Sequence, residues 1–224
     1  MKSPSNINER TEWINENATF VINSLNRKAI DDYTSIQKTS NEGFISRNES
    51  FKTAFKNFYG MPQAHLGKDF ENLFFQIFER LSDNRNNQIE IEKILKELYH
   101  VKTKKEVNTI QFSFVSKMIH TIDNEKPIYD KMIRILFNFP DQSNITDFGK
   151  KIYGCIEQYN VIQEEYKRII EFKLVDKPLK MFGNRFNYVE ISEVKKLDFI
   201  YWVTGRFFSS ENEYFKKKIN KITI

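Results

Sequence analysis

The sequence has very few of the residues that build covalent or metal-held frameworks. Cys155 is the only cysteine in 224 residues, so the chain cannot form an internal disulfide. Its three histidines are scattered, and with a single cysteine they give none of the spacings typical of a zinc site. The sequence therefore predicts a protein that holds neither a metal nor a cofactor.

Long hydrophobic runs are also missing. The polar N-terminal stretch contains no apolar core of the length that a signal peptide needs. No later run approaches the roughly 20 apolar residues that span a bilayer. Together with the single cysteine, these absences predict a cytoplasmic protein that does not insert into a membrane.

Motifs that define an enzyme class by themselves are absent as well. The chain has no glycine-rich phosphate loop and no GxSxG, HExxH or CxxC motif, and its seven glycines leave little room for a hidden one. Any chemistry must therefore come from individual polar side chains that the fold brings into position.

What the chain does have is aromatic residues and helical periodicity. Its 21 Phe and 10 Tyr predict an unusually aromatic interior. Apolar residues recur at helical spacing, and nothing alternates with period two for long enough to form a strand, so the fold class is all-α with roughly ten helices. Residues 1–8 are expected to be flexible, and residues 9–224 to form a single domain, as one body or as two lobes around a cleft near residues 112–137.

The expected helices fall between residues 9 and 25 and at 30–36, 44–59, 66–81, 89–99, 145–172 and 190–204, with two more inside 112–137. Asn144 is the expected cap of the helix at 145–172. Residues 180–186 are expected to form a loop that mixes positive charge with aromatic rings.

The stretch 112–137, FSFVSKMIHTIDNEKPIYDKMIRILF, is the strongest candidate for chemistry. It is typical of two apolar helices joined by a polar connection that ends in Pro-Ile-Tyr-Asp. Pro127 suits the first turn of the second helix, which would place Asp130 in that turn. A carboxylate there is stabilised by free N–H groups and by the helix dipole. Asp130 is therefore either an ordinary N-terminal acid or a catalytic carboxylate.

This order of elements resembles the catalytic segment of the helix-hairpin-helix DNA glycosylases. Residues 116–120 (SKMIH), 127–130 (PIYD) and 197–202 (LDFIYW) are similar, more narrowly, to a divergent bacterial group with the 8-oxoguanine DNA glycosylase fold. The resemblance implies a protein that binds double-stranded DNA and hydrolyses the N-glycosidic bond of a damaged or modified base. Its setting would be DNA repair or defence against foreign DNA such as that of phages. Asp130 takes the position of the family's catalytic carboxylate.

The sequence departs from the family pattern in two places. The glycine-containing hairpin that contacts DNA phosphate in the family is not visible at residues 101–111, where Lys102, Lys104 and Lys105 are candidates to replace its contacts. The Schiff-base lysine of bifunctional members falls near Phe112 by the family's spacing. Lys117, thirteen residues before Asp130, is then the candidate nucleophile, and a monofunctional enzyme that uses water is favoured.

A glycosylase must also hold an extruded base between aromatic rings and polar groups. Trp202, with Asp198 one helical turn earlier, is the first candidate for this pocket, and His120 and Tyr129 are further candidates. Each has a plain alternative: Trp202 as a core aromatic residue and His120 as a hydrogen-bonded core histidine. Lys117 has one too, as a surface lysine whose stem lies along apolar neighbours.

The positive charge is concentrated near the C-terminus. The formal net charge is +5, and residues 177–224 carry ten Lys and Arg against five acids, so this segment accounts for the whole excess. The asymmetry favours a polyanionic partner such as DNA, with Lys180 and Arg185 as contacts, or is simply a solvated basic tail. Two rival functions stay open: a catalytically silent DNA-binding module, and a helical protein-interaction or regulatory protein. The target base, lyase activity and oligomeric state stay open as well.

Overall fold

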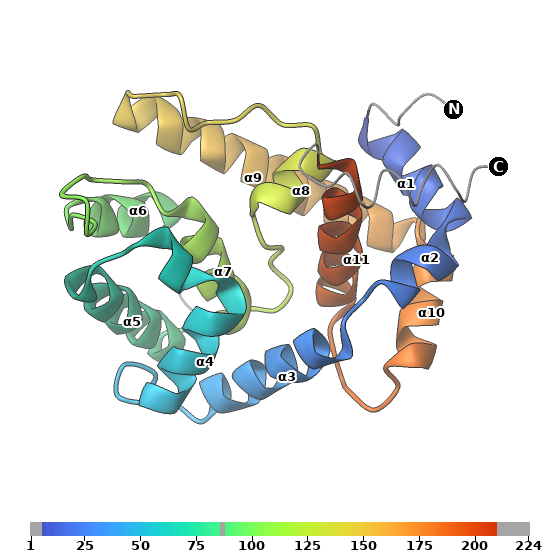
Figure 1. Cartoon of the computed structure of the whole chain (residues 1–224), viewed down its shortest axis with the longest axis horizontal. Helices are drawn as coiled ribbons and strands as arrows, with labels where there is room; N and C mark the ends of the chain where they lie inside the picture. The colour runs from blue at the N-terminus through green and yellow to red at the C-terminus, as the bar shows by residue number, and fades with distance from the viewer. Residues whose placement is uncertain (1–5, 86–87, 210–224) are drawn as a thin grey trace. The chain divides into compact units, whose positions relative to one another are not determined.

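The computed structural model describes residues 6–85 and 88–209 (Figure 1). Over these residues the chain forms eleven α-helices and one short 3-10 helix, with no β-strand, which confirms the predicted all-α fold of roughly ten helices. None of the helices in these two ranges is long and apolar enough to cross a membrane.

Residue contacts divide the chain into two compact units, each assembled from separate pieces. Among the described residues, unit 1 contains those from 6 to 25, Tyr129–Asp141, and those from 160 to 209. Unit 2 contains Asn26–Ile128 and Gln142–Tyr159. The long helix α9 (Phe148–Glu171) contributes to both.

Unit 1 is organised around α11. Its helices are α1 (Ile7–Glu16), α2 (Ala18–Asn23), α8 (Lys131–Leu136), α10 (Asp176–Arg185), α11 (Glu193–Phe208) and the later part of α9. Helix α11 packs against α8, α10 and α2. Apolar side chains on most sides of α11 are buried, among them Leu197, Ile200, Tyr201 and Phe207. Such an arrangement is typical of a helix in the middle of a bundle.

Unit 2 is built around α7. Its helices are α3 (Arg27–Asn41), α4 (Glu49–Tyr59), the 3-10 helix η1 (Met61–Ala64), α5 (Lys68–Asp83), α6 (Ile91–Tyr99), α7 (Phe112–Ile122) and the first part of α9. Helix α7 packs against α3, α5 and α6. The Phe55 ring lies 5.4 Å from Phe78 and 5.8 Å from both Phe74 and Phe75, centroid to centroid, and all four rings are buried. The aromatic interior expected from the composition is thus found between α4 and α5.

The first helix starts earlier than predicted. The Oδ1 atom of Asn6 accepts a hydrogen bond from the backbone N–H of Glu9 at 3.0 Å and caps α1, so Ile7 and Asn8 are helical. The helix therefore begins two residues before the predicted start at residue 9, while residues 1–5 lie outside the described ranges.

Several other boundaries differ from the prediction, two of them for a clear local reason. Residues 180–185 belong to helix α10 and not to a loop, because Pro178 stands in its first turn, where N–H groups have no intrahelical acceptor and proline is tolerated. Helix α9 begins at Phe148, and its cap is Asp147, whose Oδ1 accepts from the N–H of Lys150 at 2.8 Å. Asn144 is therefore not the cap.

Candidate active site

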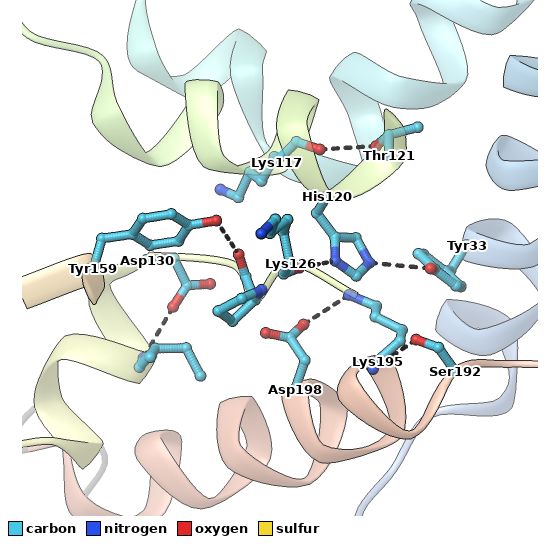
Figure 2. Close-up of polar contacts among 12 residues, drawn as sticks. Tyr33, Lys117, His120, Thr121, Lys126, Asp130, Tyr159, Ser192, Lys195 and Asp198 are labelled. Carbon is cyan, nitrogen blue, oxygen red and sulfur yellow. Dashed lines mark hydrogen bonds and ion pairs between the residues drawn. The ribbon is translucent and has the colours of Figure 1, made fainter. Parts of the chain in front are cut away.

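Asp130 is the N-cap of α8, one position before the place predicted for it. Its backbone is extended, and its Oδ1 accepts hydrogen bonds from the N–H groups of Met132 at 2.8 Å and Ile133 at 3.0 Å. Figure 2 shows the Asp130 side chain with one of these two hydrogen bonds. Pro127 is buried and precedes the helix, so it does not stand in the first turn as predicted. Aspartate is among the strongest N-capping residues, which explains why the helix starts after it.

The second oxygen of Asp130 is available for another role. Within the described part of the chain, Oδ2 has no hydrogen-bond or ion-pair partner, and the residue is partly exposed. The cap fixes the carboxylate at the positive end of a helix and leaves this oxygen for water or a ligand. Chemically, such a group can stabilise a nearby positive charge or orient a water molecule.

The helix that carries Asp130 is also anchored at its other end. The buried guanidinium of Arg10 donates hydrogen bonds through Nη1 to the carbonyl oxygens of Ile135 and Leu136, in the last turn of α8. Burial lowers the pKa of Arg10, while the charge of Glu9 acts in the opposite direction. Both ends of this six-residue helix therefore have side-chain partners in unit 1.

A buried phenol, Tyr166, lies in the interior of unit 1, the unit that also contains Asp130. Its ring packs in one cluster with Phe137, at 6.4 Å and nearly parallel, and with Tyr201, at 5.4 Å and nearly perpendicular. Burial raises the pKa of Tyr166 well above its ordinary value, followed by the negative charge of Asp198 and smaller contributions from Tyr201 and Asp130. The phenol therefore stays protonated over the physiological range.

Asp198 is held by a lysine that the sequence analysis did not single out. The Nζ atom of Lys195 lies 2.7 Å from Oδ2 of Asp198, with the two side chains 3% and 7% exposed (Figure 2). The same ammonium lies 4.5 Å from the centre of the Phe199 ring. Lysine and aspartate three residues apart on a mostly apolar helix were the sequence signal for this pair.

The two aromatic candidates for a base pocket have different surroundings. Tyr129 is buried, directly before Asp130. Trp202 is 38% exposed, and the Arg206 guanidinium lies 5.0 Å from the centre of its ring. The plain alternative of a core tryptophan is therefore wrong. Asp198, one helical turn earlier, is buried, so the two candidates differ in their exposure, and their shared role in a base pocket stays a prediction.

Lys117 lies on the buried helix α7 of unit 2. Its Nζ donates to Ser113 Oγ at 3.0 Å and to the Tyr59 carbonyl oxygen at 3.5 Å, and it lies 5.0 Å from the centre of the Phe114 ring. The residue is only 9% exposed, so it is not a surface lysine. These contacts fix the amine in the interior of the protein.

His120 and Tyr159 fix the connection that follows α7. The Nδ1 atom of the fully buried His120 is 2.6 Å from the Lys126 carbonyl oxygen, and Nε2 is 3.0 Å from the Tyr33 hydroxyl (Figure 2). Because a carbonyl oxygen only accepts, Nδ1 carries the proton, and Nε2 of a neutral ring accepts from Tyr33. The Tyr159 hydroxyl donates to the Pro127 carbonyl oxygen at 3.0 Å. His120 therefore has the structural role that was its plain alternative, and its place in a base pocket receives no support.

The segment between α6 and α7 is an ordered turn that exposes three lysines. The N–H of buried Thr103 donates to the Val107 carbonyl oxygen at 2.9 Å, and the N–H of Glu106 donates to the Thr103 carbonyl oxygen at 2.9 Å. Glu106 has φ +58°, the left-handed conformation that glycine most readily adopts. A turn therefore forms here without the glycine whose absence the sequence analysis noted. We call it the lysine turn; its exposed members are Lys102, Lys104 and Lys105.

The remaining predicted DNA contacts have partners within the protein. Exposed Lys180 pairs with Asp176 at 2.6 Å, a surface ion pair that a ligand can replace at little cost. Arg185 donates hydrogen bonds to the Ile22 carbonyl oxygen, to Asn23 Oδ1 at 3.3 Å and to the Leu25 carbonyl oxygen, so it holds the end of α2. The four C-terminal lysines, at positions 216, 217, 218 and 221, lie outside the described residues.

Comparison with protein-family models, with curated proteins and with solved structures gives no match for this chain. The likeness to the glycosylases therefore rests on the sequence segments given above. Within residues 6–85 and 88–209, no three His, Cys, Asp or Glu side chains are placed to hold a metal ion.

Proposed function

We propose that the protein is a DNA glycosylase-like protein that binds double-stranded DNA and hydrolyses the N-glycosidic bond of a damaged or modified base. The observation that carries this proposal is that the two oxygens of the Asp130 carboxylate have different surroundings. Oδ1 of Asp130 is held by two backbone N–H groups, and Oδ2 has no protein partner in the described residues. The negative charge is therefore fixed in place while one oxygen remains for the reaction.

The reaction needs such a fixed charge. As the bond between the sugar and the base breaks, positive charge develops on the sugar ring, and a preorganised anion stabilises that charge. The carboxylate can also orient a water molecule, whose oxygen bonds to the anomeric carbon while the bonding electrons leave with the base. Release of the base thus leaves an abasic sugar in the DNA.

Water is a better nucleophile for this site than Lys117. The Lys117 amine is buried and donates to Ser113 and to a backbone carbonyl oxygen. These contacts, and its departure from the family's spacing, favour a monofunctional mechanism without a Schiff base.

The lysine turn is the proposed phosphate contact. It presents Lys104 and Lys105 to solvent from a backbone that is fixed by hydrogen bonds, including one from the Lys104 N–H to the His65 carbonyl oxygen at 3.1 Å. Lysines bound to phosphates displace counterions, which provides affinity without sequence preference. DNA repair and defence against foreign DNA are the two settings in which this activity would be used.

A second candidate is a DNA-binding module without catalysis. One observation favours it: the cap on α8 is by itself sufficient reason for an aspartate at position 130. In that case the lysine turn would carry the function.

The two candidates differ in what Asp130→Asn does. Asparagine also caps helices, so the fold and DNA affinity should persist, while loss of the charge should slow base release by a factor of roughly a hundred to a thousand. The test incubates both proteins with duplexes that carry oxidised, alkylated, deaminated and hypermodified bases, and measures free base and abasic sites. DNA binding without base release by the wild type on any of these substrates would point to the silent module.

A further inference from the structure

Helices α8 and α11 lie side by side in unit 1 (Figure 1), and Gly205 of α11 lies against the backbone of Met132 in α8. A Cβ atom on Gly205 would stand 2.2 Å from the Met132 carbonyl oxygen and 2.8 Å from the Met132 carbonyl carbon. Both are backbone atoms, so they cannot rotate away as the end of a side chain can. Any other residue at position 205 must push the two helices apart.

This contact falls on the residue that holds the carboxylate of Asp130. The N–H of Met132 is one of the two donors to Oδ1, and the carbonyl group of the same residue rests on Gly205. At the other end of α8, Arg10 holds the carbonyl oxygens of Ile135 and Leu136. A displacement at Gly205 is therefore transmitted to the first turn of α8 and to its cap.

The backbone conformation of α11 gives no separate reason for this glycine. Gly205 does not have a positive φ, and glycine inside a helix is less stable than alanine. The close approach of Met132 is thus the physical reason for a glycine at this position.

We propose that Gly205 is a positioning residue for Asp130: the bare backbone of α11 sets where the first turn of α8 lies, and so where the carboxylate points. Arg10 secures the far end of the same helix. The inference rests on the proposed catalytic role of Asp130, although its structural part can be tested without activity.

The experiment compares Gly205→Ala with Gly183→Ala in the full chain. Gly183 lies inside α10 of the same unit, and a Cβ there meets nothing within 4 Å, so it receives the same substitution without the contact. Hydrogen exchange of the Met132 and Ile133 amides, followed by NMR, reports whether the cap persists. We expect exchange about tenfold faster in Gly205→Ala, the size of effect that loss of a cap produces, and unchanged exchange in Gly183→Ala.

Kinetics give the second readout. On a substrate that the wild type processes, Gly205→Ala should lower kcat about a hundredfold, as displacement of a catalytic group by an ångström does, while KM and DNA affinity stay unchanged. Unchanged amide exchange, or unchanged kcat in a folded and active variant, would overturn the inference. A wild type that releases no base would remove the proposed function, and the amide exchange would still decide whether Gly205 positions Asp130.

Arg10→Lys provides a second test in case Gly205→Ala does not fold. This change keeps the positive charge but removes the Nη1 atom that donates to the carbonyl oxygens of Ile135 and Leu136. It adds no atom at the contact between α8 and α11. Faster exchange at Met132 and Ile133, with lower kcat and unchanged KM, supports the proposal that the backbone contacts of α8 position Asp130. Wild-type values of exchange and of kcat would overturn it.

Discussion

Asp130 and Asp147 both cap the start of a helix, but their surroundings differ. Each is an aspartate that precedes a helix and accepts a backbone N–H of the first turn, Asp130 at the start of α8 and Asp147 at the start of α9. Asp147 is exposed, and its helix is long. Asp130 is partly exposed and precedes a short helix whose last turn is held by Arg10.

The difference separates the reason for an aspartate from the reason for its surroundings. Capping accounts for both residues equally. It accounts neither for the Arg10 guanidinium that holds the last turn of α8 nor for Gly205, which lets α11 lie against the backbone of Met132. The features around Asp130 that helix capping does not explain are therefore the ones to change by mutation.

The largest effect is expected from the buried ion pair on α11. Lys195→Met leaves the Asp198 carboxylate buried without its lysine, and removal of one partner of such a pair lowers the free energy of unfolding by about 3–5 kcal/mol. Urea denaturation measures the change.

Lys196→Met is the matched control, one residue along the same helix. Lys196 pairs with Glu193 at 2.6 Å, and Glu193 is half exposed, so its loss should cost about 0–1 kcal/mol. Equal losses for the two variants would show that the interior pair contributes no more than a surface pair.

The lysine turn should separate DNA binding from chemistry. Charge reversal in Lys104→Glu/Lys105→Glu should weaken duplex binding about tenfold or more at 0.1 M salt, equally for all sequences, and reduce the slope of log K against log salt by about 2. Fluorescence anisotropy over a range of salt concentrations measures both quantities. Binding that is indifferent to salt in the wild type would instead favour a protein-interaction role.

Tyr166 should make stability depend on pH in the alkaline range. Its pKa in the folded protein is raised, so its contribution is fully present below the ordinary pKa of about 10 and is lost as pH rises above that value. The unfolded chain then releases a proton that the folded chain keeps, which lowers the free energy of unfolding by about 1.4 kcal/mol per pH unit. Burial raises the pKa of Tyr201 too, so two such residues contribute.

Tyr166→Phe should reduce the pH dependence of the free energy of unfolding by the contribution of one proton. Denaturation at pH 9, 10 and 11 gives the slope for each protein, and other groups that titrate in this range cancel in the difference. An identical slope in the two proteins would mean that Tyr166 does not keep, in the folded chain, a proton that the unfolded chain releases.

The sequence predicted the fold class because apolar spacing is set by helix geometry, and it missed boundaries that depend on single capping residues. Asp147 and Asn144 are both plausible caps by residue type, and only the packed structure shows which one the helix uses. Helix α10 falls where the sequence predicted a loop at residues 180–186, and Pro178 is compatible with the helix because a proline in the first turn leaves it intact.

The sequence also identified Asp130 as the residue to examine, through its place after an apolar helix and a proline. It did not identify Tyr166, Lys195 or Gly205, since each depends on a neighbour far along the chain or on another helix. A tyrosine at helical spacing is usually core, and nothing local marks one whose pKa burial raises well above its ordinary value. The glycine-free lysine turn was hidden because Glu106 adopts the conformation usually left to glycine.

The most direct test of the central claim is single-turnover base release by the wild type, Asp130→Asn and Asp147→Asn. Both substitutions keep a capping side chain and should lower stability by about 1 kcal/mol or less. We predict that Asp130→Asn slows release roughly a hundredfold to a thousandfold with unchanged DNA affinity, while Asp147→Asn releases base at the wild-type rate. Equal rates in the wild type and in Asp130→Asn would contradict the account, because the charge of Asp130 would then play no part in the reaction.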